Sequence, residues 1–65
     1  METDIGTVAG LIWKLLNASG PLSITLLLKE IDASRDTVMQ GLGWLAREGK
    51  IQIETEGRTK RVLLS

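Results

Sequence analysis

The side chains best suited to specific recognition lie at the start of a predicted helix. Arg35, Thr37 and Gln40 supply a guanidinium, a hydroxyl and a carboxamide within six residues. A guanidinium suits guanine, a carboxamide suits adenine, and threonine suits a phosphate or a thymine methyl group. This group predicts contacts with nucleic-acid bases. The alternative is that these are ordinary solvated residues, with Arg35 and Asp36 at a helix start.

A second group of cations follows a turn near the end of the chain. Arg58, Lys60 and Arg61 stand next to Gly57, in a segment that reads as the tip and return strand of a hairpin. A basic hairpin tip can contact the backbone or minor groove of a duplex. The other interpretation is an edge strand that its charges keep soluble, and Glu54 and Glu56 weaken the positive field there.

A third feature favours a protein partner. Trp44 and Gly43 fall on the outward half of the helix, although glycine inside a helix costs about 1 kcal/mol relative to alanine. Tryptophan beside bare backbone suits a docking surface, to which an outward-facing Leu26 can add. Alternatively, Trp44 folds against the hairpin or the end of the first helix, and Leu26 is a single exposed leucine. Trp13 is predicted to belong to the core.

Composition excludes several kinds of site. The chain has no cysteine, which rules out a disulfide or a thiolate metal site, and no histidine, the commonest general base. No carboxylate pair has the spacing of a catalytic site. We therefore predict a protein that is not an enzyme and has no metal or cofactor, and the sequence indicates no small-molecule pocket.

Charge is balanced overall but not along the chain. Residues 1–34 carry two cations against four carboxylates, and residues 35–65 carry six against four, so the halves have charges of −2 and +2. This asymmetry has the sign that DNA binding needs and a small magnitude. An acidic N-terminus and the absence of an apolar run near 20 residues predict a cytoplasmic protein.

Two helices are predicted in the first half of the chain. Thr3 or Asp4 can cap the first, which Gly20 and Pro21 terminate. Its apolar face consists of Ile5, Val8, Ala9, Ile12, Leu15 and Leu16. Leu22-Ser23 is a short extended link, with Ser23 placed to cap a second helix. The core face of that helix is Ile24, Leu27, Leu28 and Ile31.

The third helix is predicted over residues 34–48 and a hairpin over residues 51–64. Ser34 caps the helix, the Thr37 hydroxyl closes back on the cap, and Gly49 ends it. Val38, Leu42 and Leu45 form its inward stripe, flanked by Met39 and Ala46, with Gly41 in close packing at the core edge. The outward half consists of Asp36, Thr37, Gln40, Gly43, Trp44 and Arg47.

The hairpin is indicated by alternation and a turn signal. Residues 50–54 alternate polar and apolar, Glu56-Gly57 marks the turn, and residues 61–64 return. A turn centred on Glu56-Gly57 places Ile51 opposite Val62, and a bulge would shift this register. The order of elements is helix, short strand, two helices and a two-stranded wing. This predicts one α+β domain over residues 1–65, a winged helix-turn-helix.

The chain resembles the winged helix-turn-helix superfamily over its whole length. Ile12-Trp13, Leu22-Ser23-Ile24 and the run from Gly43 to Ile51 also resemble a family of small uncharacterised prokaryotic winged-helix proteins. The superfamily resemblance implies DNA binding and transcription regulation, often as dimers. The narrower family implies no particular activity. A typical recognition helix is more basic than this one, which has arginine only near its ends, at Arg35 and Arg47.

Two functions follow from the sequence. In the first, residues 34–48 are a recognition helix for double-stranded DNA and residues 51–64 its wing. The contacts would come from Arg35, Thr37, Gln40, Arg47, Arg58, Lys60 and Arg61. In the second, the domain is a protein-interaction module, a homodimer or a partner-docking domain, which uses Leu26, Gly43 and Trp44.

Overall fold

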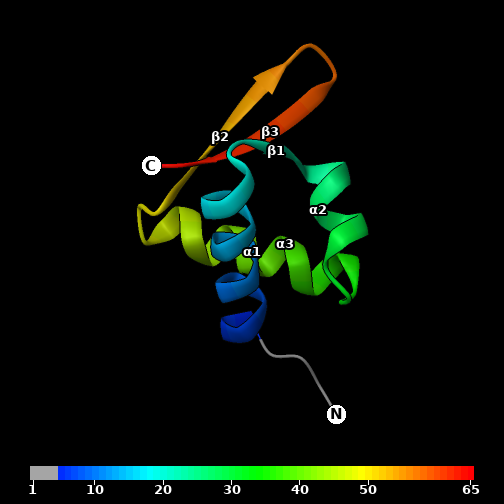
Figure 1. The fold of residues 1–65 in the computed structure, drawn as a ribbon, viewed down its shortest axis with the longest axis vertical. Helices are drawn as coiled ribbons and strands as arrows, with labels where there is room; N and C mark the ends of the chain where they lie inside the picture. The colour runs from blue at the N-terminus through cyan, green and yellow to red at the C-terminus, as the bar shows by residue number, and fades with distance from the viewer. Residues whose placement is uncertain (1–4) are drawn as a thin grey trace.

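The computed structural model describes residues 5–65, and these form three helices and a three-stranded antiparallel sheet (Figure 1). The elements in chain order are α1 (Ile5–Ser19), β1 (Leu22–Ser23), α2 (Ile24–Glu30), α3 (Arg35–Arg47), β2 (Ile51–Glu56) and β3 (Thr59–Leu64). The predicted architecture is confirmed. The predicted caps of the first helix, Thr3 and Asp4, lie outside the described residues.

Helix α1 buries one face and ends at a glycine. Val8, Ala9, Ile12 and Leu16 are buried as the apolar spacing predicts, whereas Leu15 is half-buried and Ile5, at the first turn, is exposed. Gly20 has a φ of 79°, and its amide donates to the Leu16 carbonyl at 2.8 Å. A positive φ favours glycine, so this residue ends the helix and turns the chain into β1.

Serine caps begin both helices of the helix-turn-helix. The Ser23 hydroxyl oxygen accepts a hydrogen bond from the Leu26 amide at 3.1 Å, and the Ser34 oxygen accepts one from the Thr37 amide at 3.2 Å. The Ser34 and Thr37 hydroxyl groups are also 2.8 Å apart and share a hydrogen bond. These bonds satisfy amide groups that a helix start leaves unpaired. Both predicted caps are confirmed.

Helix α3 ends close to its predicted boundary, with Glu48 as its C-cap and Gly49 at a φ of 72°. The Lys50 amide donates to the Leu45 carbonyl at 2.9 Å, which closes the end of the helix and aims the chain into β2.

The sheet has the order β1-β3-β2, and its register differs from the predicted one. Ile51 pairs with Leu64, and Ile53 pairs with Val62. The prediction of Ile51 opposite Val62 was wrong by two residues, because the turn is Gly57-Arg58 and not Glu56-Gly57. Gly57 has a φ of 64° and Arg58 has no positive φ. Glycine at the first central position is the pattern of a type II′ turn.

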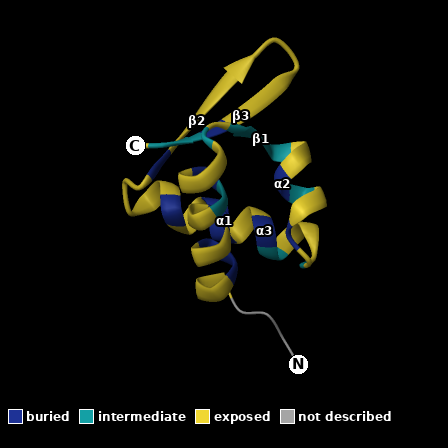
Figure 2. Cartoon of the chain, in the orientation of Figure 1, coloured by how far each residue is buried: buried dark blue, intermediate teal, exposed yellow. Residues whose placement is uncertain are grey.

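The core lies between the three helices and the base of the sheet (Figure 2). Its residues are Val8, Ala9, Ile12, Leu16, Leu27, Ile31, Val38, Leu42, Leu45, Ile51 and Val62. Met39 is exposed, and so is Ala46, so the flanks of the α3 stripe lie outside this core. The hairpin projects beyond the helices, which leaves Ile53 exposed although it alternates correctly.

The prediction that Trp13 belongs to the core was wrong. The residue is 40% exposed, so it lies outside the core. Ile12, the residue before it, is fully buried. Successive side chains of a helix point in different directions, so the boundary between core and surface falls between these two residues.

Candidate functional site

The outward side of α3 is a ridge that no other element of residues 5–65 covers. Asp36, Gln40, Gly43 and Arg47 follow one another at helical spacing, opposite the buried Val38, and all four are exposed. We call these four residues the outer ridge. Two of the predicted DNA contacts, Gln40 and Arg47, therefore stand on one continuous line.

The other two predicted contacts of α3 lie beside the ridge. Arg35 is exposed at the first helical position, one turn before Met39. Thr37 is half-buried, and its hydroxyl bonds the Ser34 hydroxyl at 2.8 Å. Because the cap occupies this hydroxyl, the methyl group of Thr37 is the part left for a base.

The two glycines of α3 have different surroundings. A Cβ built on Gly41 would lie 3.2 Å from Val8 Cγ1 and 3.2 Å from Ile12 Cδ1. One built on Gly43 would meet nothing within 4 Å. Gly41 therefore allows α1 and α3 to pack closely, as the sequence predicts. Gly43 leaves bare helix backbone in the middle of the outer ridge.

The hairpin cations are spread over two faces and a tip. Lys60 pairs with Thr55 and shares the face of Ile53 and Val62. Arg61 pairs with Glu54 on the opposite face, and Ser23 is its neighbour on the other side. Arg58 sits in the turn at the projecting end. A single surface can therefore engage Arg58 with Lys60, or Arg58 with Arg61, more readily than all three.

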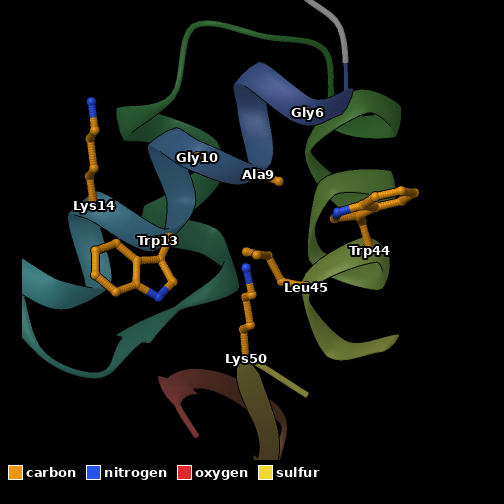
Figure 3. Close-up of a pocket in the computed structure, with 8 residues that line it drawn as sticks. All are labelled: Gly6, Ala9, Gly10, Trp13, Lys14, Trp44, Leu45 and Lys50. Atoms are coloured by element: carbon orange, nitrogen blue, oxygen red, sulfur yellow. The ribbon is translucent and has the colours of Figure 1, made fainter. Parts of the chain in front are cut away.

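Trp44 does not fold against the hairpin. It is 56% exposed, the highest value among the large hydrophobic residues that the structure describes as exposed. It stands across a groove from Trp13 of α1 (Figure 3). The groove has a volume of about 350 Å³ and is lined by Gly6, Ala9, Gly10, Trp13, Lys14, Trp44, Leu45 and Lys50.

Leu26 and Gly43 are not part of this groove. Leu26 is 40% exposed on α2, and neither residue belongs to the lining. Gly43 shares the outer ridge with Gln40, whereas Trp44 lines the groove together with residues of α1. The sequence grouped Leu26, Gly43 and Trp44 as one protein interface. In the structure only Trp44 lines the groove, and the other two lie elsewhere on the surface.

Sequence reasoning missed the groove. One signal was available: Gly6, Ala9, Gly10 and Trp13 recur at steps of three, four and seven residues, which places three small residues beside an indole on one helix face. That face runs next to the apolar one. The two lysines that complete the lining, Lys14 and Lys50, are far apart in sequence and carry no comparable signal.

Residues 5–65 contain no group of three or more potential metal ligands. None of the helices within this range combines the length and apolar character needed to cross a membrane.

Comparison with known proteins places the chain in a family. The chain matches two structures of HlyU from Vibrio cholerae N16961, one of them reduced HlyU, at 28% and 29% identity with TM-scores of 0.71 and 0.70. The matches cover 86% and 85% of this chain but only 59% and 56% of the HlyU chains. No curated protein matches. The profile of a family described as a winged helix-turn-helix domain, DUF2582, matches residues 1–64, and the chain belongs to this family.

Proposed function

We propose that this domain binds double-stranded DNA as a non-catalytic, regulator-like module, with α3 in the major groove and the β2–β3 hairpin as its wing. The observation that carries the proposal is the outer ridge. It is exposed along the whole of α3, no element of residues 5–65 covers it, and Gly43 lets a partner reach the helix backbone. In a helix-turn-helix this surface reads base edges.

The comparisons support the same proposal. The family is a winged helix-turn-helix family, and HlyU is a winged-helix regulator. The chain spans little more than half the length of HlyU, so only the shared domain enters the comparison. A shared fold does not by itself establish a shared function, so the proposal depends on which side chains the surface presents to DNA.

Each proposed contact has a role set by its position. Arg35 reaches a base edge from the first turn of α3, and Gln40 does so from the ridge, each by two parallel hydrogen bonds. Thr37 offers its methyl group. Arg47 at the far end of the helix contacts a phosphate, as do Arg58 at the wing tip and the cation of one hairpin face, Lys60 or Arg61.

The charge of the surface predicts weak non-specific binding. The hairpin carries three cations and two carboxylates, and the ridge carries one of each sign. Because phosphate neutralisation supplies most non-specific affinity and sets its salt dependence, we expect a modest DNA affinity that falls with salt less than that of strongly basic regulators.

A titration of the labelled protein with a duplex at low salt, followed by NMR, tests the proposal. Shifts should concentrate at residues 35–40, 43 and 47 and at residues 58–61. The double variant Arg58→Glu, Lys60→Glu should weaken binding, and the matched double variant Lys14→Glu, Lys29→Glu, with the same charge change away from this surface, should weaken it much less. Absence of binding to any duplex at low salt contradicts the proposal.

A second candidate function is supported by the exposure of Trp44. Tryptophan is enriched among residues that dominate protein interfaces, and this one is 56% exposed in the C-terminal half of α3. In this alternative a protein partner or a second copy docks on Trp44, with Gly43 or Leu26 at its margin. Trp44→Ala would then abolish complex formation in sedimentation experiments without changing the fold. A wild-type protein that is monomeric at all concentrations excludes the homodimer.

A further inference from the structure

Every aromatic side chain of this protein lines the same groove. The sequence contains two tryptophans and no tyrosine or phenylalanine. Trp13 comes from α1 and Trp44 from α3, residues 31 positions apart, and their indoles flank one groove (Figure 3). Its volume of about 350 Å³ falls within the range of small-molecule sites. The packing of α1 against α3 therefore brings both indoles of the chain into the lining of one groove.

The floor of the groove is made of small residues. Gly6, Ala9 and Gly10 contribute no side chain larger than a methyl group, and Leu45 closes the base. Gly10 is exposed, and a Cβ built on it would meet nothing within 4 Å. Packing within residues 5–65 therefore does not require glycine there, although glycine inside a helix costs stability. Its effect is to widen the space between the indoles.

The charged members of the lining are both cations. Lys50 extends toward the space between Trp13 and Trp44, and Lys14 stands at the rim with its ammonium group directed outward (Figure 3). Among residues 5–65, no carboxylate belongs to the lining. A second copy docked by the same groove would bring a second cationic rim against the first. The groove is therefore complementary to an anion and not to itself.

We propose that the Trp13–Trp44 groove binds a small organic anion that consists of a planar apolar ring with a carboxylate. The ring packs against the apolar lining that the indoles contribute to, where aromatic contact and apolar burial favour a flat group. The carboxylate accepts a hydrogen bond from the Lys50 ammonium group, with Lys14 as the second cation. This proposal is independent of DNA binding, and its test contains no DNA.

The indole N–H groups make the test specific to the site. A protein labelled with ¹⁵N gives two indole cross-peaks, one from each tryptophan, and both report on this groove. The probes are phenylacetate, its neutral amide phenylacetamide, and cyclohexylacetate, which keeps the charge but not the planar ring. For a ligand of this size we expect a dissociation constant for phenylacetate on the order of 1 mM.

Phenylacetate should shift both indole peaks, and each of the other probes should bind about three- to fivefold more weakly. Lys50→Met should weaken phenylacetate binding by about the same factor while leaving phenylacetamide unaffected. The matched control Lys29→Met, on the exposed side of α2, should leave both unchanged. Trp44→Ala should abolish phenylacetate binding, with the backbone spectrum confirming that the fold is kept.

Three results would overturn the proposal. The first is equal binding of phenylacetate and phenylacetamide, since the site would then not select an anion. The second is no movement of either indole peak at 10-fold the expected dissociation constant. The third is broadening of both indole peaks with protein concentration in the absence of any probe, because a second copy would then occupy the groove.

Discussion

Gly41 of α3 lies so close to Ile12 of α1 that a Cβ built on the glycine would be 3.2 Å from Ile12 Cδ1. Val8 Cγ1 would lie at the same distance, and the Ala9 amide nitrogen at 3.4 Å. Ile12 and Val8 are fully buried, which restricts their room to move. The missing side chain at Gly41 therefore sets how closely α3 can pack against α1.

We expect Gly41→Ala to destabilise the domain by about 1 kcal/mol. The overpacked methyl group costs about 1–3 kcal/mol, which exceeds the helix-propensity gain of up to about 1 kcal/mol. Urea unfolding followed by circular dichroism measures the free energy of unfolding. An increase in that free energy would show that Val8 and Ile12 can shift and that close packing at Gly41 is not needed.

Gly43→Ala is the matched substitution in the same helix and should have the opposite effect on stability. Nothing lies within 4 Å of its added Cβ, so the variant should gain about 0.5–1 kcal/mol. If DNA approaches the backbone at the outer ridge, the same variant should bind a duplex more weakly despite its higher stability. A variant that is more stable and binds DNA as well as the wild type argues against close approach at Gly43.

The start of each later helix could be predicted because its cause is local. Ser23 and Ser34 each accept a bond from an amide three residues ahead, and this geometry depends on nothing outside the segment. The hairpin register could not be predicted in the same way. A shift of two residues keeps Ile51 and Val62 on the same face, so alternation fits both registers equally.

The outer ridge was also predictable, because a helix wheel needs only spacing. The groove was not. Whether Trp13 is buried depends on the angle and separation at which α1 crosses α3, which the packing at Gly41 helps to set. A wheel places Trp13 at the edge of the apolar face, and the crossing geometry decides that this edge borders a groove and not the core.

Removal of the Ser34 hydroxyl should destabilise α3 by about 1 kcal/mol. Ser34→Ala loses the bond from the Thr37 amide, at 3.2 Å, and the bond between the two hydroxyl groups, at 2.8 Å. Thr37→Val is the control, because it removes only the hydroxyl pair and keeps the cap on the amide. Thermal unfolding should rank wild type, Thr37→Val and Ser34→Ala in that order. Equal losses in the two variants would mean that the hydroxyl pair, and not the amide cap, stabilises the helix start.

Lys60 and Arg61 should contribute unequally to DNA binding, although they are adjacent in sequence. They lie on opposite faces of the hairpin, and Arg61 stands directly across from Glu54, whereas Lys60 stands across from the uncharged Thr55. The Glu54 carboxylate, at cross-strand distance, weakens the attraction between Arg61 and a DNA phosphate. Lys60→Gln should therefore lower the salt dependence of binding by about one counterion, and Arg61→Gln by clearly less.

Titrations of each variant with one duplex at several salt concentrations measure this difference. The triple variant Glu54→Gln, Lys60→Gln, Arg61→Gln and the double variant Glu54→Gln, Lys60→Gln complete the comparison. Without Glu54, the loss caused by Arg61→Gln should rise toward that caused by Lys60→Gln, since the offsetting charge is gone. If the loss stays small, the face that carries Arg61 points away from DNA. In that case the wing contacts the duplex through the face of Lys60 and the tip at Arg58.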